Sequence, residues 1–277
     1  MNGILIVNKS EGFTSRDVVN KLSKIFNTKK IGHTGTLDPI AKGVLVVVLG
    51  KYTKLCEDLT QTYKEYIATF KLGILTDTLD ITGNIIDEKD VTVNEEEIRN
   101  VIASYKCVYD QEVPIYSSVK INGRKLYEYA RNGEEVTLPK REVDIKNIEV
   151  IDINKDIVKI KCLVSKGTYI RSLIRDIGES LNTHATMTDL IRTKQGIFDI
   201  KDSYTIEDIE NDNYKLIDIE DVMDVCVIDN DAYLKNVTNG VKLKLDIKNE
   251  YILFKHENEN IALYKKDNDY FRMYIHF

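Results

Sequence analysis

The segment from Gly32 to Pro39 holds the densest group of chemically active side chains in the sequence. It reads Gly-His-Thr-Gly-Thr-Leu-Asp-Pro, so an imidazole, two hydroxyls and a carboxylate stand close together. The two glycines indicate a loop with more backbone freedom than a buried scaffold needs. Pro39 disfavours a helical conformation at Asp38 and so restrains where the carboxylate points. Because nucleophilic catalysis requires such positioning, Asp38 is the candidate catalytic residue.

Other interpretations of this loop stay open on the residues alone. An Asp before a Pro is a common turn former, and His33 by itself could be a loop histidine with satisfied hydrogen bonds. A metal-dependent hydrolase using His33 and Asp38 would need further ligands, but no HxxxH, HExxH or paired carboxylate lies nearby. No GK[ST] follows the glycines, which excludes a P-loop. We therefore expect no metal site.

Aromatic and basic residues are combined in three other stretches, at 64–66, 116–131 and 165–171. Aromatic rings can stack on unpaired bases, and Arg and Lys can hold phosphates. Taken singly, each stretch also has a structural interpretation. A strand tyrosine such as Tyr66 is usually part of the core, and Arg171 at a helix start could pair with a local acid such as Asp176.

The elements that must position these groups follow from hydrophobic spacing. Thr14 and Asp17 form a capping box that begins a helix through Phe26. Buried strands are expected at 3–8 and 44–49, a strand apolar on both faces at 66–71, and further strands at 144–153 and 157–164. Helices are expected at 51–59, 95–105, 126–131 and 169–181.

This mixture of strands and helices lacks strict βαβ alternation. It favours an α+β fold on a mainly antiparallel mixed sheet flanked by helices. Near Asp224 the pattern changes to short strand-like runs at 225–228, 241–245, 251–255, 260–264 and 270–275. We expect a catalytic domain over residues 1–223 and a small β-rich module over residues 224–277.

Composition narrows the class of protein. The 277 residues are 43% hydrophobic, enough to bury a core. No apolar run could span a bilayer and no N-terminal signal segment is evident, so we expect a cytoplasmic protein without a membrane partner. The four cysteines are scattered without a CxxC pair, which argues against a disulfide framework and a zinc site.

Charge is unevenly distributed along the chain. The net charge of −6 does not by itself indicate a nucleic-acid binder. Residues 1–56 carry +6 and residues 119–194 carry +4, whereas 57–118 and 202–277 carry −8 each. The two basic segments could fold into one positive face, and a polyanion responds to the field within a Debye length of roughly 8 Å. Ordinary solvated surface charge would give the same counts.

In order along the chain, these segments resemble the bacterial tRNA pseudouridine-55 synthase family, the TruB type. The resemblance covers roughly residues 1–200, and Gly-His-Thr-Gly-x-Leu-Asp-Pro at 32–39 is its most specific part. The other matching segments are GILIVNK at 3–9, KEY at 64–66, TDTLD at 76–80, YSSVK at 116–120, KLYEYAR at 125–131, SKGTYIR at 165–171 and LIRT at 190–193.

The resemblance implies a pseudouridine synthase fold without a cofactor. In this family the aspartate matching Asp38 is the essential catalytic residue, and the arginine matching Arg171 pairs with it. The tyrosine matching Tyr66 stacks on the target base, with a late proton transfer left open. The histidine matching His33 helps hold the flipped-out RNA. Six further residues match motif positions near the pocket or the RNA: Lys9, Asp77, Lys120, Tyr169, Leu190 and Arg192.

Two departures from the family pattern stand near these positions. Asn8-Lys9-Ser10 replaces the usual Asp-Lys-Pro, which affects the rigidity of the first loop, and Ile191 stands where a second arginine is common. The C-terminal module resembles the small PUA-type RNA-binding domain of the family. The local charge of −8 over residues 202–277, the segment that contains this module, argues against strong phosphate contact.

The implied substrate is tRNA, with the target uridine at position 55 in the T-loop of the T-arm. The reaction breaks the N1–C1′ bond of a flipped-out uridine and rejoins the uracil through C5. Flipping costs a few kcal/mol, and stacking on Tyr66 returns about 1–3 kcal/mol. Burial disfavours an ionised carboxylate, and the guanidinium of Arg171 offsets this by gripping Asp38 at two points. Which atom Asp38 attacks is left open by the sequence.

A second hypothesis is a catalytically idle tRNA-binding or RNA-folding protein on the same scaffold. The presence of Asp38, Tyr66 and Arg171 together argues against it, because a binding protein needs no such set. We expect a monomer.

Overall fold

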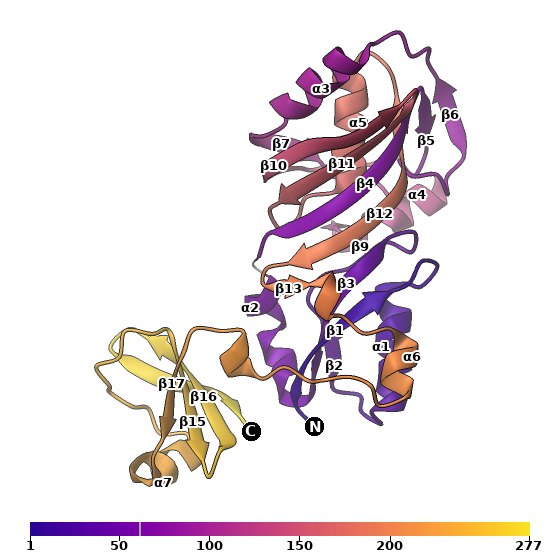
Figure 1. The fold of residues 1–277 in the computed structure, drawn as a ribbon. Helices are drawn as coiled ribbons and strands as arrows, with labels where there is room; N and C mark the ends of the chain where they lie inside the picture. The colour runs from indigo at the N-terminus through magenta and orange to yellow at the C-terminus, as the bar shows by residue number, and fades with distance from the viewer. Residues whose placement is uncertain (61) are drawn as a thin grey trace.

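The larger part of the protein is built on one nine-stranded mixed sheet (Figure 1). The computed structural model describes residues 1–60 and 62–277. Seven strands follow one another as β1-β3-β12-β4-β11-β10-β7, while β2 pairs with β3 and β13 with β12. Their bounds are β1 Gly3–Lys9, β2 Ile31–His33, β3 Lys42–Leu49, β4 Lys64–Leu72, β7 Val108–Glu112, β10 Lys140–Asn154, β11 Ile157–Val164, β12 Ala185–Gln195 and β13 Phe198–Asp199. These pairs are antiparallel except β3 with β12, which confirms the predicted fold class.

Helices and short hairpins complete this part. Helices α3 and α5 lie along one side of the upper sheet, and α1 packs beside β2 and α6 (Figure 1). The helices are α1 Ser15–Ile25, α2 Cys56–Thr60, α3 Glu95–Ser104, α4 Leu126–Asn132, α5 Ile170–Ser180 and α6 Ile206–Glu210, with 3-10 turns η1 Gly50–Leu55, η2 Ile200–Asp202 and η3 Ile219–Asp221. Two hairpins are formed by β5 Ile74–Thr76 with β6 Ile85–Glu88, and by β8 Lys120–Ile121 with β9 Arg124–Lys125.

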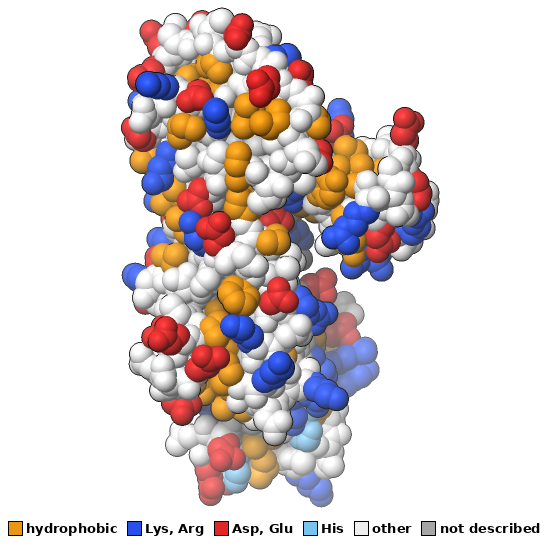
Figure 2. All heavy atoms as spheres, turned by 90° about the vertical axis from the view of Figure 1, so that its right-hand side faces the viewer, with side chains coloured by type: hydrophobic (Ala, Val, Ile, Leu, Met, Phe, Trp, Pro, Cys, Tyr) orange, Lys and Arg blue, Asp and Glu red, His pale blue; other side chains and the backbone are white. Residues whose placement is uncertain are grey.

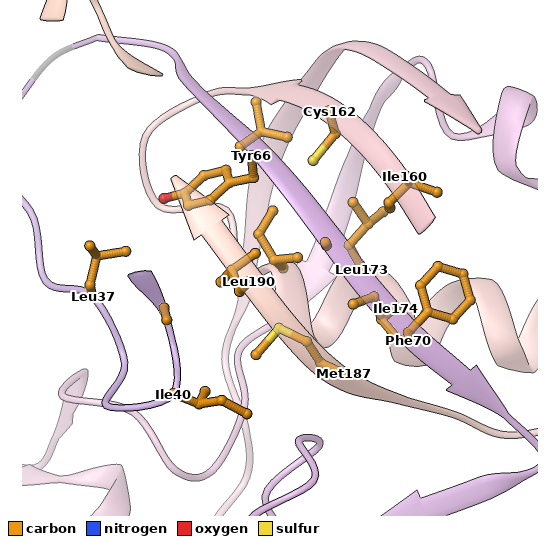
Figure 3. Packing of buried hydrophobic residues seen from close by; sticks show 14 of the residues in the cluster. Leu37, Ile40, Tyr66, Phe70, Ile160, Cys162, Leu173, Ile174, Met187 and Leu190 are labelled. Carbon is orange, nitrogen blue, oxygen red and sulfur yellow. The ribbon is translucent and has the colours of Figure 1, made fainter. Parts of the chain in front are cut away.

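The main core fills the space between α5 and the sheet. Side chains alternate along β4, so that Tyr66, Ala68 and Phe70 are buried on the helix side. Figure 3 shows Phe70 packed with residues from α5 and β12, and Tyr66 at the edge of the cluster with its hydroxyl toward the segment that carries Leu37. The opposite face of β4, with Ile67 and Thr69, is half-exposed. The prediction that this strand is apolar on both faces was therefore wrong, because α3 and α5 pack on one face only.

Strand β3 does have two buried faces. Leu45 and Val47 belong to the main core, whereas Val44, Val46 and Val48 belong to a second cluster. That second cluster also contains side chains of the C-terminal sheet, whose strands pair in the order β14-β15-β16-β17. Their bounds are β14 Val225–Asp229, β15 Tyr251–His256, β16 Glu259–Asp267 and β17 Tyr270–His276, with η4 Asp231–Tyr233 and α7 Leu234–Thr238 beside them. The division between residues 223 and 224 stays a prediction.

Four further features of the structure differ from what the sequence predicts. Gly32 and His33 belong to β2 instead of a loop, because they pair with β3. The helix expected at 51–59 is a 3-10 turn followed by the short α2. Residues 241–245 form no strand, and Leu243 makes only an isolated bridge to the C-terminal sheet. Strand β12 was missed, although it is central to the sheet.

Gly43 allows β3 to pass close to β12. Its φ of +99° is a conformation that side chains rarely adopt. A Cβ atom at this position would lie 2.3 Å from the carbonyl oxygen of Arg192, a distance that is sterically forbidden. Gly43 therefore allows β3 to approach β12 directly after the loop that carries Asp38.

The described residues contain no helix that is both long and apolar enough to cross a membrane.

Candidate active site

A cavity of about 320 Å³ opens where β4, β12, the start of α5 and the loop after β2 meet. This volume lies at the lower end of the range that holds small ligands. The cavity is lined by six of the ten residues singled out from the sequence: Asp38, Tyr66, Tyr169, Arg171, Leu190 and Arg192. They come from four separate segments of the chain, which the fold brings together.

Asp38 and Arg171 form a two-point ion pair in this cavity. Nε of Arg171 lies 2.9 Å from Oδ2 of Asp38, and Nη2 lies 3.3 Å from Oδ1. The Arg171 side chain is 5% exposed, whereas that of Asp38 is 35% exposed. The arginine is thus fixed inside the protein, while the carboxylate can be reached from the cavity. Pairing of Arg171 with Asp176 does not occur, because Asp176 accepts hydrogen bonds from Arg175.

The remaining donors of Arg171 are also used. Nη1 donates to the carbonyl of Thr78 at 2.8 Å, and Nη2 donates to the carbonyl of Tyr116 at 3.1 Å. Oδ2 of Asp80 lies 3.8 Å from Nη1, and Asp80 is buried. Two carboxylates therefore share one buried guanidinium. Sequence reasoning missed Asp80, although it closes the matching segment TDTLD.

Buried side chains anchor the backbone on both sides of Asp38. The Ser15 hydroxyl accepts from the amide of Leu37 at 2.8 Å and lies 3.2 Å from the carbonyl of the same residue. The Lys9 ammonium donates to the carbonyl of Pro39 at 3.3 Å. These contacts hold the two neighbours of Asp38 and so restrict where its carboxylate can point.

The structure changes the interpretation of Lys9. Its side chain is fully buried, and its ammonium also donates to the carbonyls of Ser10 and Phe13. Burial lowers the pKa of Lys9 to about 8. No part of the side chain reaches the surface, and a contact of Lys9 with RNA stays a prediction. Lys9 positions the loop that carries Asp38.

The first half of the loop is held by β12. Nη2 of Arg192 donates to the carbonyl of Gly35 at 3.1 Å, and Nε donates to the carbonyl of Val44 at 2.6 Å. The amide of Gln195 donates to the hydroxyl of Thr34. Sequence reasoning missed Gln195 and Ser15, because neither lies within a motif that suggested chemistry.

Tyr66 stands on β4 beside the ion pair. Its neighbours across the sheet are Arg192 on β12 and Cys162 on β11. The residue is 7% exposed and lines the cavity near Leu190 (Figure 3). Within the described part of the chain, its hydroxyl has no hydrogen-bond partner. The ring is therefore available for stacking, and the hydroxyl is not needed to hold the ring in place.

The N-terminus of α5 is held by a residue that the sequence did not reveal. Oε1 of Gln111 accepts from the amide of Tyr169 at 2.8 Å, and Nε2 of Gln111 donates to the hydroxyl of Tyr109 at 2.7 Å. Gln111 is almost fully buried. This bond fixes the turn that delivers Arg171 to the cavity.

Besides Lys9, three of the predicted residues lie outside the cavity lining. His33 is in β2, where burial and the charges of Arg192 and Arg16 lower its pKa, so the imidazole is neutral at neutral pH. Asp77 accepts a hydrogen bond from the amide of Asn84 in a turn. Lys120 is exposed on the hairpin of β8 and β9. Contacts of these three residues with RNA stay predictions.

Charges of both signs are mixed on the surface shown in Figure 2, with hydrophobic side chains between them. The described residues include no group of three or more His, Cys, Asp or Glu side chains placed to hold a metal ion.

We expect Ser15→Ala to lower kcat roughly tenfold with little change in KM, because the amide of Leu37 loses its buried partner. An unsatisfied buried amide costs about 1–3 kcal/mol, and Asp38 would lose part of its fixed position. Steady-state kinetics with the RNA substrate measures both constants. Ser23→Ala is the matched control, since Ser23 lies on the same helix and also bonds a backbone carbonyl. Equal effects of the two substitutions on kcat would contradict the positioning role.

Two family models match the chain. The model described as "TruB family pseudouridylate synthase (N terminal domain)" matches residues 23–170. The model described as "tRNA pseudouridylate synthase B C-terminal domain" matches residues 171–237. Asp38 and Tyr66 fall in the first match, and Arg171 begins the second.

Curated relatives carry one name over most of the chain. A "tRNA pseudouridine synthase B" of Caldicellulosiruptor saccharolyticus is 44% identical over 249 residues, covering 90% of this chain and 86% of the relative. A protein of the same name from Fusobacterium nucleatum subsp. nucleatum is 48% identical over 201 residues, covering 73% of this chain and 70% of the relative.

Two solved structures share the fold across nearly the whole chain. One is described as "Structure of H/ACA RNP bound to a substrate RNA containing 2'-deoxyuridine", with a TM-score of 0.70, 25% identity, and coverage of 99% of this chain and 83% of that chain. The other is described as "Crystal Structure of a Cbf5-Nop10-Gar1 Complex", with a TM-score of 0.69, 28% identity, and coverage of 95% and 78%.

Proposed function

The chain belongs to the TruB family of pseudouridylate synthases, and from this premise we propose that it converts uridine 55 in the T-loop of tRNA to pseudouridine, with Asp38 as the catalytic carboxylate. Membership of this family gives the general activity, which is the conversion of uridine to pseudouridine in tRNA. The position in the T-arm and the role of Asp38 are our proposal.

The observation that carries the proposal is the ion pair of Asp38 and Arg171 in a cavity lined by Tyr66. The isomerisation breaks the N1–C1′ bond, forms a C1′–C5 bond, releases the proton from C5 and adds one to N1. Nothing is oxidised and no group is transferred to the RNA. A carboxylate held at one place beside the ribose is the group that such a reaction requires.

The shape of the cavity supports base flipping. A uridine stacked in a folded loop cannot bring its glycosidic bond to a carboxylate that lies within a protein cavity, so the nucleotide must leave the stack. The ring of Tyr66 and the side chain of Leu190 offer an apolar surface for the extruded base. Stacking on an aromatic ring contributes about 1–3 kcal/mol, comparable to the cost of flipping.

The most general test uses tRNA transcribed with uridine that carries tritium at C5. Formation of the C1′–C5 bond displaces that hydrogen, so each conversion releases tritium to water. We expect release of one tritium equivalent per tRNA. A catalytically idle tRNA-binding or RNA-folding protein would bind the same transcript and release none, and that result would replace the proposal by the second hypothesis.

We expect Tyr66→Phe to bind tRNA as the unaltered protein does, and Tyr66→Ala to bind roughly 5- to 150-fold more weakly. Phenylalanine keeps the stacking surface, whereas alanine loses about 1–3 kcal/mol. Dissociation constants should be measured with Asp38→Asn also present, so that the RNA stays unmodified. Tyr270→Ala is the control, because Tyr270 is an exposed tyrosine on the C-terminal sheet. Equal weakening by Phe and Ala at position 66 would contradict the stacking role.

A further inference from the structure

One wall of the cavity holds two buried cations, Lys64 and Arg192. Lys64 is 7% exposed and Arg192 is 1% exposed, and both line the cavity. Among residues 1–60 and 62–277, no carboxylate oxygen lies within 4.0 Å of either charged group. Arg171, on the other wall, differs in this respect because it is neutralised by Asp38 and Asp80.

Lys64 and Arg192 both lie close to the same point on the catalytic loop. The position that a Cβ atom of Gly35 would occupy is 3.4 Å from Nη1 of Arg192 and 3.6 Å from Cε of Lys64. The ammonium of Lys64 donates to the carbonyls of Thr60 and Thr62. Carbonyl oxygens satisfy these donors but carry no net charge, so the two positive charges stay uncompensated.

This arrangement is costly in the protein without a ligand. Removing charged groups from water without a counter-charge costs several kcal/mol for each ion. The cost is evident for Lys64, because burial and the charges of Arg192 and Lys166 lower its pKa to about 8. A bound anion would supply the missing counter-charge and remove much of this cost.

We propose that Lys64 and Arg192 form a phosphate subsite that binds a phosphate flanking the flipped uridine. The inference rests on the proposed function, since the tRNA substrate supplies a phosphodiester on each side of the target nucleoside. Lys64 and Tyr66 are two residues apart on β4 and so face the same side of the sheet, about 7 Å apart along the strand. One nucleotide can thus stack its base on Tyr66 while its phosphate reaches Lys64, and binding energy from the phosphate helps draw the sugar toward Asp38.

The test removes the positive charge of Lys64 and the negative charge of the RNA phosphate separately. Stem–loop RNAs of the T-arm are made with an uncharged methylphosphonate linkage on the 5′ or the 3′ side of the target uridine. Each RNA is bound to the full-length protein with Lys64 or with Lys64→Met, both in an Asp38→Asn background. With Lys64 present, we expect the methylphosphonate at one of the two sites to weaken binding roughly tenfold. With Lys64→Met, the same linkage should weaken binding less than twofold.

Two further measurements separate charge from structure. Lys64→Met should lower the slope of log K against log salt by about 0.7, the share of one phosphate contact on a single strand. Lys64→Arg keeps the charge and should restore both the affinity and the slope. Lys159→Met on the neighbouring β11 is the matched control, since Lys159 is exposed.

The phosphate subsite would be overturned if, at both sites, the methylphosphonate weakened binding by the same factor in Lys64→Met as in the protein with Lys64. An unchanged salt slope in Lys64→Met would also overturn it. Tritium release with the unmodified stem–loop distinguishes this outcome from failure of the proposed function. If the protein with Asp38 releases tritium but the charge removals are additive, only the subsite is wrong.

Discussion

We expect replacement of Asp38 by Asn to lower the rate of pseudouridine formation by about 10⁴-fold or more, while tRNA binding stays within about threefold of the unaltered protein. Removal of a nucleophile or base that acts at the reacting bond has effects of this size. Asparagine has nearly the same shape and keeps an oxygen that can accept from Arg171, so the cavity is retained and only the negative charge is lost. Single-turnover tritium release measures the rate, and filter binding measures the affinity.

Asp156→Asn provides the matched control for this substitution. Asp156 pairs with Lys71 at the surface, with a side chain that is 39% exposed, and it does not line the cavity. We expect it to change the rate less than twofold. A rate for Asp38→Asn within tenfold of the unaltered protein would remove Asp38 from the reaction.

We expect replacement of Arg171 by Met to lower the rate by about 10³-fold and to destabilise the fold by about 3–5 kcal/mol. The stability loss follows because Asp38 and Asp80 would both lose the cation between them, and breaking a buried ion pair by removing one partner has a cost of this size. The rate falls because the carboxylate loses its two-point support. Urea denaturation gives the free energy of unfolding, and tritium release gives the rate.

Two related variants separate charge from geometry. Arg171→Lys keeps the positive charge but cannot grip Asp38 at two points, so we expect most of the stability to return and the rate to stay roughly 100-fold low. In Asp38→Asn/Arg171→Met, one of the two unpaired carboxylates is absent, so the loss of stability should be smaller than the sum of the single losses. Additive losses, or full activity of Arg171→Met, would contradict the coupling.

Much of the fold could be predicted from the sequence because local patterns were regular. Thr14 and Asp17 form the capping box that begins α1, as expected. The helix expected at 126–131 is observed as α4, and Gly133 ends it with a left-handed conformation at a φ of +66°. In each case a few neighbouring residues determine the local conformation.

Strand β12 could not be predicted because its side chains do not alternate regularly. The pairing register with β4 shifts between Met187 and Asp189 and again between Arg192 and Lys194. A bulge adds a residue to one strand and disrupts the period of two from which strands are recognised. The family resemblance, and not a strand pattern, therefore identifies Leu190 and Arg192.

The contacts that build the site depend on residues far apart in the chain. Arg171 and Asp38 are 133 residues apart, and Ser15 and Leu37 are 22 residues apart. Motif chemistry singled out Asp38, but no local pattern indicates that Ser15 holds its neighbour or that Asp80 shares Arg171. Lys64 lies within a matched motif, and among residues 1–60 and 62–277 only the absence of a nearby carboxylate distinguishes it from an ordinary strand lysine.

Mapping of pseudouridine at single-nucleotide resolution, in unmodified tRNA incubated with the protein, tests the central claim most directly. We predict one new pseudouridine, at position 55 in the T-loop, with the unaltered protein and none with Asp38→Asn. Absence of pseudouridine with the unaltered protein, modification at another position, or equal modification by Asp38→Asn would contradict the claim.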